Sequence, residues 1–102
     1  MRRYYFVYMM ASRYRGTLYV GVTSDLPRRV REHREGMSEG FTKSYDVKLL
    51  VHYEVFEDVM PAIRREKLIK RWRRAWKFNL IEEQNADWDD RYDNLLNELP
   101  LA

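Results

Sequence analysis

Two short runs of aromatic and β-branched residues near the start of the chain constrain its fold more than any other feature. Residues 4–10 and residues 17–22 both have the composition and the length of β-strands. Residues 12–16, which join them, are mostly polar and close with a glycine. The pattern therefore predicts a β-hairpin.

Capping residues predict where the first helix begins and ends. Residues 24–27 place a capping side chain ahead of a proline, and proline is tolerated in the first turn of a helix because its missing N–H has no partner there. We expect this helix to run to about residue 35 and to stop at Gly36. Residues 36–45 hold two glycines among mixed polar residues and are expected to form a loop.

The second half of the chain adds one strand and two helices. Residues 47–55 alternate apolar and polar side chains except at Leu50, which predicts a strand with one buried face and with His52 pointing outward. A long amphipathic helix is expected over residues 61–83, and a short acidic helix over about residues 87–99. The apolar row of the long helix consists of Leu68, Trp72, Trp76 and Leu80.

The expected order, β-β-α-β-α-α, makes the chain a single α+β domain over residues 1–102, with a core of about residues 3–84. A chain of 102 residues can bury a core, and the lack of cysteine excludes disulfides, thiolate zinc sites and cysteine nucleophiles. No apolar run approaches the ~18–20 residues of a membrane span. The first residues alternate like a strand and continue into the fold, unlike a leader, so we expect a cytoplasmic protein.

Charge is divided unevenly along the chain. Residues 1–81 carry a net charge of +9 and residues 82–102 carry −6, which leaves +3 for the whole chain. A basic block of this kind favours a polyanionic partner such as nucleic acid. A solvated surface with both signs dispersed explains the charge equally well, so charge alone does not assign a function.

Glu66 is a carboxylate at the edge of an apolar stripe. In a helix it shares a side with Ala62 and Ile69, where desolvation disfavours a charge unless a cation compensates. One interpretation is a surface ion pair with Lys70 or Arg73. The other is a ligand for a hard divalent cation, which prefers oxygen and keeps most of its water.

Four further residues and one glycine need an explanation beyond packing. Arg29 and His33 lie four residues apart in the first helix and share one face, where an arginine can clamp a phosphate and an imidazole can move a proton. Ordinary helix surface is the alternative. Tyr8 and Tyr19 lie mid-strand, where tyrosine usually packs, but Gly21 gives up packing within a strand and often marks a close approach of backbone or ligand.

Basic residues are concentrated in residues 64–77, which hold eight Lys and Arg in fourteen positions, interleaved with Trp72 and Trp76. The two tryptophans have the spacing of core residues. The cations either cover a phosphate backbone or only keep the helix soluble.

The order and spacing of these residues resemble the GIY-YIG nuclease family, and more specifically its small stand-alone bacterial members. The likeness consists of residues 6–8, residues 19–21, Arg29 eight positions after the second motif, and the distant Glu66. It implies a three-stranded antiparallel sheet flanked by helices. Phe6 replaces the glycine of the first motif, and we expect this to change packing, not chemistry.

The resemblance also implies roles for single residues. It implies hydrolysis of phosphodiester bonds with one Mg²⁺ or Mn²⁺ ion on Glu66 and with Arg29 at the phosphate. One or both of Tyr8 and Tyr19 contact the attacking water or the phosphate, with His33 as a helper. The residues expected to contact nucleic acid are Gly21, Arg28, Arg31, Lys43, Lys70, Arg73 and Asn85.

We therefore expect a metal-dependent endonuclease acting on DNA, with no small-molecule cofactor and no membrane partner. The alternatives are an inactive module that only binds nucleic acid and a protein-interaction domain that uses the acidic residues 82–98. The sequence leaves open the structure of the substrate, the tyrosine that acts as base and the oligomeric state.

Overall fold

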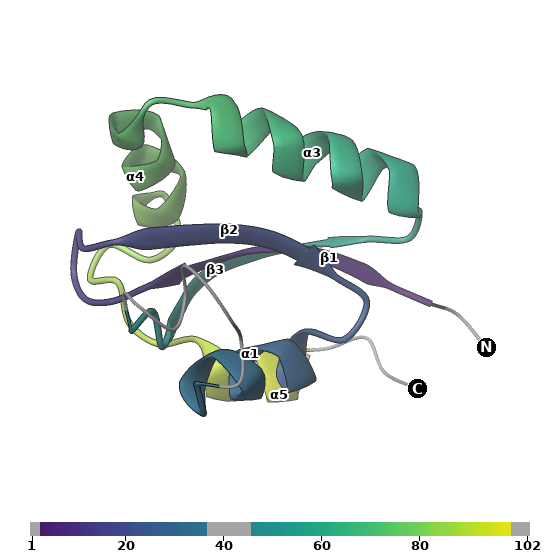
Figure 1. The fold of residues 1–102 in the computed structure, drawn as a ribbon, viewed down its shortest axis with the longest axis horizontal. Helices are drawn as coiled ribbons and strands as arrows, with labels where there is room; N and C mark the ends of the chain where they lie inside the picture. Colours follow the sequence, from purple (N-terminus) through teal and green to yellow (C-terminus); the bar gives the residue numbers. More distant parts are fainter. Residues whose placement is uncertain (1–2, 37–45, 99–102) are drawn as a thin grey trace.

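A three-stranded antiparallel sheet forms the centre of the molecule, in a computed structural model that describes residues 3–36 and 46–98. The strand order is β2-β1-β3, and the helices cover both faces of the sheet, with α3 and α4 on one face and α1 and α5 on the other (Figure 1). This arrangement confirms the predicted α+β class. The strands are β1 (Tyr5–Ala11), β2 (Leu18–Thr23) and β3 (Leu49–Phe56), and the helices are α1 (Leu26–Arg34), α3 (Val59–Arg71), α4 (Arg74–Glu82) and α5 (Tyr92–Glu98).

Strand β1 lies between the other two strands and is buried on both faces. Successive side chains of a strand point to opposite sides, so Val7 and Met9 pack against the α3 side whereas Tyr8 and Met10 pack against α1 and α5. Every residue from Phe6 to Ala11 is buried as a result. This burial explains why the sequence of β1 is an almost unbroken apolar run.

Strand β3 contains an irregularity that the alternation of its side chains did not predict. Met9 pairs with His52 and Met10 pairs with Leu50, which leaves Val51 as an extra residue in β3. Such a bulge shifts the alternation by one position, and three consecutive residues of β3, Leu50 to His52, are buried. The prediction that His52 points outward was therefore wrong, because its ring is only 6% exposed and bonds to Glu54.

The long helix expected over residues 61–83 is in fact two helices. Trp72 and Arg73 have extended backbone angles, with ψ values of 147° and 156°, and separate α3 from α4. The predicted apolar row is thereby broken, and Leu68 and Trp76 are 48% and 49% exposed. The side chains that α3 buries against the sheet are Ala62, Glu66 and Ile69.

The last helix is shorter than the predicted residues 87–99, because Trp88 does not belong to it. Trp88 has a positive φ of 59°, lies before α5, and packs edge to face on Phe78 of α4 with ring centroids 5.0 Å apart. Its indole N–H donates to Glu82. Trp88 therefore fixes the end of α4 to the α3 side of the sheet before the chain crosses to α5 on the other side.

Gly36 ends α1 as expected and has a φ of 69°, which glycine adopts without strain. The loop predicted beyond it lies outside the described residues from position 37 to position 45. No helix in the described part of the chain is long and apolar enough to span a lipid bilayer.

Candidate active site

The hairpin places Tyr8, Tyr19 and Gly21 on the face of the sheet that α1 covers. Tyr8 pairs directly with Gly21 across the two strands, and Met10 pairs with Tyr19. A Cβ atom at position 21 would lie 2.6 Å from Oη and 2.7 Å from Cζ of Tyr8. The glycine in the strand thus marks a close approach of the Tyr8 ring. A side chain at position 21 would collide with that ring, so only glycine leaves room for it.

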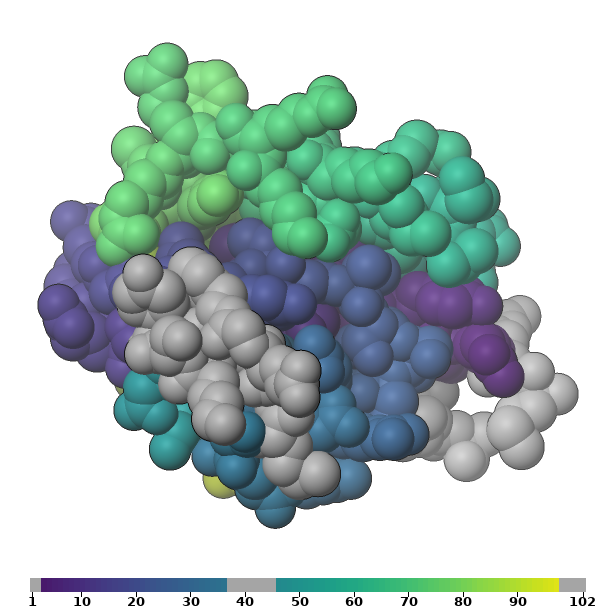
Figure 2. Space-filling model, viewed as in Figure 1, coloured from purple at the N-terminus to yellow at the C-terminus, as the bar shows by residue number. Residues whose placement is uncertain are grey.

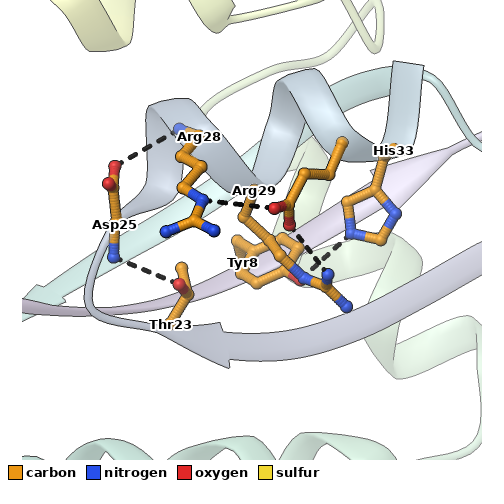
Figure 3. A network of polar contacts seen from close by, with 7 residues as sticks. Tyr8, Thr23, Asp25, Arg28, Arg29 and His33 are labelled. Atoms are coloured by element: carbon orange, nitrogen blue, oxygen red, sulfur yellow. Dashed lines mark hydrogen bonds and ion pairs between the residues drawn. The ribbon is translucent and has the colours of Figure 1, made fainter. Parts of the chain in front are cut away.

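Helix α1 adds Arg29 and His33 to this group, because residues four apart share a helix face. The Oη atom of Tyr8 lies 3.1 Å from Nε2 of His33, and Nε of Arg29 donates to the same Oη over 3.3 Å (Figure 3). The ring of Tyr19 lies 5.0 Å from that of His33 and 6.1 Å from that of Tyr8. Two strands and one helix therefore bring together four polar side chains predicted from the sequence, here called the tyrosine group: Tyr8, Tyr19, Arg29 and His33.

The environment of this group fixes its protonation. Burial raises the pKa of Tyr8 above its usual range, although the hydrogen bond from Arg29 opposes the shift. Burial, together with the nearby charge of Arg29, lowers the pKa of His33 to about 4. At neutral pH the site thus contains a neutral imidazole, a neutral Tyr8 phenol and a charged guanidinium.

The Nδ1 atom of His33 is buried, and the described residues offer it no hydrogen-bond partner. A buried polar atom without a partner costs about 1–3 kcal/mol. One ring nitrogen of His33 thus contacts Tyr8, whereas the other has no partner among the described residues.

Glu32 is a site residue that the sequence analysis missed. Its carboxylate accepts a hydrogen bond from Nη1 of Arg29 over 3.1 Å and another from Nε of Arg28 over 3.2 Å. The hydrogen bond from Arg29 is the main reason why the pKa of Glu32 is lowered. Spacings of three and four residues in one helix were the signal that could have identified it.

A polar cleft of about 210 Å³ opens beside these arginines, at the start of α1. Asp25 caps the helix there by accepting from the backbone N–H of Arg28, and its own N–H donates to Thr23 (Figure 3). Arg29 thus contacts Tyr8 on one side and borders the open cleft on the other. The residues that line the cleft are Thr23, Ser24, Asp25, Arg28, Arg29 and Glu32.

Glu66 lies in a different layer from the tyrosine group. It is 8% exposed and sits on the face of α3 that packs on the sheet, whereas Arg29 and His33 are on the opposite side in α1. Its carboxylate pairs with the ammonium of Lys70 at 2.7 Å, and that lysine side chain is 51% exposed. The ion pair that the sequence left open is therefore present.

Glu66 fits one kind of metal site and not another. The described residues contain no group of three or more His, Asp or Glu side chains that could enclose an ion. A single buried carboxylate that pairs with a solvent-exposed lysine fits a hard cation that keeps most of its water. Mg²⁺ and Mn²⁺ are of this type, and zinc in a closed site is not.

The residues predicted to contact nucleic acid differ in how accessible they are. Arg28, Arg31, Lys70 and Arg73 are exposed. Asn85 is buried, and its amide donates to the carbonyls of Val51 and Asp89, so its side chain is used to hold the fold. Lys43 lies outside the described residues.

A second polar cluster, on the α3 side of the sheet, was also missed. Arg65 of α3 donates two hydrogen bonds to the Glu54 carboxylate of β3, over 2.8 and 3.0 Å, and His52 lies 2.9 Å from the same carboxylate. Burial favours a raised pKa for Glu54, but the hydrogen bonds from His52 and Arg65 outweigh it and lower the pKa to about 2. This cluster joins β3 to α3.

Comparison with known proteins agrees with the geometry. A family model described as the GIY-YIG catalytic domain matches residues 4–79, which include every member of the tyrosine group and Glu66. A UPF0213 protein of Haloquadratum walsbyi is 39% identical over 83 residues, which cover 81% of this chain and 92% of that protein. A UPF0213 protein of Staphylococcus aureus is 36% identical over 69 residues, covering 68% and 84%.

A solved structure shares the fold as well. The solution NMR structure of a UPF0213 protein from Bacillus halodurans is 24% identical in sequence and superimposes with a TM-score of 0.54. The match covers 94% of this chain and 99% of that one. The similarity therefore extends over the sheet and the helices on both of its faces.

Proposed function

Because the chain belongs to the GIY-YIG family, whose members are nucleases, we propose that it is a metal-dependent endonuclease that hydrolyses phosphodiester bonds of DNA. The observation that carries the proposal is the convergence of Tyr8, Tyr19, Arg29 and His33 beside an open cleft. In the reaction a water oxygen bonds to phosphorus while the bond from phosphorus to the leaving sugar oxygen breaks. The water loses a proton and the leaving oxygen gains one.

Arg29 stabilises the negative charge that develops on the phosphate. Hydrogen bonds to Tyr8 and to Glu32 hold its guanidinium in place before the substrate arrives. A donor fixed in advance needs no reorganisation at the moment of reaction, and this is the usual source of the largest electrostatic contribution to catalysis. In this proposal the substrate phosphate replaces Glu32 as the partner of Nη1 of Arg29.

The two tyrosines have different tasks in this proposal. Tyr8 is fully buried, its raised pKa keeps the phenol neutral, and its oxygen contacts both Arg29 and His33. Tyr8 is therefore a positioning residue. Tyr19 is only partly buried and borders His33, so we assign to its hydroxyl the contact with the attacking water.

Glu66 is the residue that would hold the divalent ion. Held there, Mg²⁺ or Mn²⁺ would supply positive charge that offsets the charge on the phosphate oxygens and the leaving oxygen. Helix α3 packs over β1 and β2 on the sheet face opposite α1, and β2 is an outer strand. A phosphodiester served by both Arg29 and Glu66 therefore runs along the outer edge of β2.

The exposed cations extend this path in both directions. Arg28 and Arg31 lie on α1, while Lys70 and Arg73 lie at the end of α3 and just after it. Cations of this kind bind the nucleic acid backbone without reading its sequence. We propose the same role for Lys43 on its sequence position alone, and we assign Asn85 to the fold.

The test is a cleavage panel on single-stranded, duplex and branched DNA and on RNA, with Mg²⁺, with Mn²⁺ and with a chelator. We expect metal-dependent cleavage that falls by about 10²–10³-fold in Arg29→Ala and is lost in Glu66→Ala. Arg64→Ala, an exposed cation on α3, is the control and keeps its activity. Metal-dependent cleavage that is unchanged in Glu66→Ala would rule out the metal assignment.

The second candidate is a module that binds nucleic acid without cleaving it. Phe6 favours it, because a buried phenyl ring stands where the first motif has glycine. The ring packs in the core between the sheet and α1, in the same cluster as Tyr8. Salt-sensitive binding by the wild type with no cleavage in any divalent ion would select this candidate.

A further inference from the structure

A cleft between two tryptophans opens where α3 ends and α4 begins, at a distance from the tyrosine group. It measures about 250 Å³ and is lined by Trp72, Trp76 and Leu80, with Asn79 and Glu83 adding polar groups. The two indoles meet edge to face at 79° with their centroids 6.2 Å apart. Trp76 is 49% exposed, so a large part of its ring is open to solvent.

The two tryptophans differ in how far they meet the core role that their spacing predicted: Trp72 is half-buried and packs against the core on the α3 side of the sheet, whereas Trp76 is exposed. The break between α3 and α4 turns Trp76 away from the sheet, and Leu68, one turn before Trp72, is 48% exposed as well. Single exposed apolar residues such as Leu68 are common and need no explanation, but two indoles that line one cleft open to solvent form a candidate binding surface.

The charge around the cleft identifies the kind of partner. The guanidinium of Arg73 lies 4.9 Å from the centre of the Trp76 ring, and that of Arg65 lies 5.3 Å from the centre of the Trp72 ring. In Figure 2 the green segment that contains both helices forms one side of the molecule, and long side chains project from it. Aromatic rings interleaved with cations are the platform on which proteins stack the bases of single-stranded nucleic acid.

The place of the cleft along α3 relates it to the proposed cleavage position. Trp72 follows Glu66 by six residues, which is about 9 Å along a helix axis. Lys70 lies between them and is exposed. When one phosphate of a strand reaches Glu66, a base that lies only one or two nucleotides further along the strand therefore reaches the tryptophans.

We propose that this cleft binds an unpaired base of the nucleic acid strand that the enzyme cleaves. The inference rests on the proposed nuclease function, and it defines the substrate class as a strand with unpaired nucleotides beside the cut. In a duplex the flat face of each base is covered by its neighbours, so only an unpaired or flipped base can stack on Trp76. Asn79 and Glu83 offer hydrogen-bonding groups to the edge of that base.

The experiment compares Trp76→Ala with the wild type in binding a thymidine oligomer of ~15 nucleotides and a blunt duplex of the same length, with a chelator present. We expect the affinity for the oligomer to fall about tenfold and the affinity for the duplex to stay within about twofold, since duplex binding depends on backbone charge. Trp76→Phe keeps a stacking ring and restores most of the lost affinity. Leu68→Ala, an exposed apolar residue on α3 outside the cleft, is the matched control and leaves both affinities unchanged.

Three results would overturn the inference: equal losses for oligomer and duplex in Trp76→Ala, no loss for either, or a loss in Leu68→Ala equal to that in Trp76→Ala. Dimerisation of the wild type that Trp76→Ala abolishes would also overturn it, because a second copy of the chain would then occupy the cleft. Circular dichroism verifies that each variant is folded. Since the assay measures binding without metal, it decides the question even where the cleavage panel shows no activity.

Discussion

His33 is the residue whose titration reports most directly on the candidate site. Burial beside Arg29 lowers its pKa to about 4, whereas an imidazole in an unfolded chain titrates near ~6.5. Below that pH the unfolded state binds a proton that the folded state does not, so stability falls as the pH falls. Between about pH 7.5 and pH 5 we expect His33 to remove about 2 kcal/mol from the free energy of unfolding, measured with urea.

The control for this prediction is His33→Gln, which keeps a polar side chain but does not titrate. Its free energy of unfolding should change less between the two pH values than that of the wild type, by about 2 kcal/mol. The range stays above the usual pKa of carboxylates, so Asp and Glu contribute little to the difference. An equal pH dependence in both proteins would mean that His33 is protonated as readily in the folded state as in the unfolded one.

Single residues also show what the sequence could and could not predict about the site. Tyr8, Gly21 and Arg29 follow motif positions at fixed spacing, and the hairpin and α1 bring them together. Glu32 was not predicted as a site residue, because ion pairs on a helix surface are common and follow no sequence motif. Glu54 stayed hidden because its partner, Arg65, is eleven residues away in another element.

Among the elements, β3 and α3 are joined by a polar contact in which Arg65 donates two hydrogen bonds to Glu54. Arg65→Ala removes two of the hydrogen bonds to the partly buried carboxylate of Glu54 and leaves it only the contact with His52 among those described above, and we expect this to cost about 1–3 kcal/mol in urea unfolding. Arg64→Ala, which removes the exposed neighbouring cation, should stay within about 0.5 kcal/mol of the wild type. A loss in Arg64→Ala as large as that in Arg65→Ala would show that general helix charge, not this contact, stabilises α3.

The boundaries of elements mark where sequence patterns stopped being informative. The hairpin and α1 were predicted within one or two residues, because turn and capping residues act locally. The break between α3 and α4 at Trp72 and Arg73 contains neither proline nor glycine, so no local sequence signal indicates that the helix ends there. The position of Trp88 depends on a contact with Phe78 of α4, which only the folded chain provides.

At the scale of the whole molecule, the acidic segment of residues 82–98 lies beside the basic helix α1, because α5 belongs to this segment. Helix α5 packs against α1, Arg34 of α1 pairs with Asp90, and Arg31 donates to Tyr92. Trp88 and Leu95 of this segment are buried on opposite sides of the sheet. Removing residues 86–102 to expose the basic surface would therefore unfold the protein, and the role of the acidic charge has to be tested by substitution.

Asp89 and Asp93 are exposed carboxylates just before and in α5, which packs against α1, and replacing both by Asn removes two negative charges from this segment. We expect non-specific duplex binding to strengthen about two- to fivefold at low salt and the difference to fade near 0.2 M salt, where charges are screened beyond about 7 Å. The opposite variant, with Asn94→Asp and Asn97→Asp, adds two charges on exposed positions of α5 and should weaken binding under the same conditions. Filter-binding or anisotropy titrations at several salt concentrations measure both. Unchanged affinity in both variants would mean that nucleic acid binds away from α1, beyond the reach of the charge of α5.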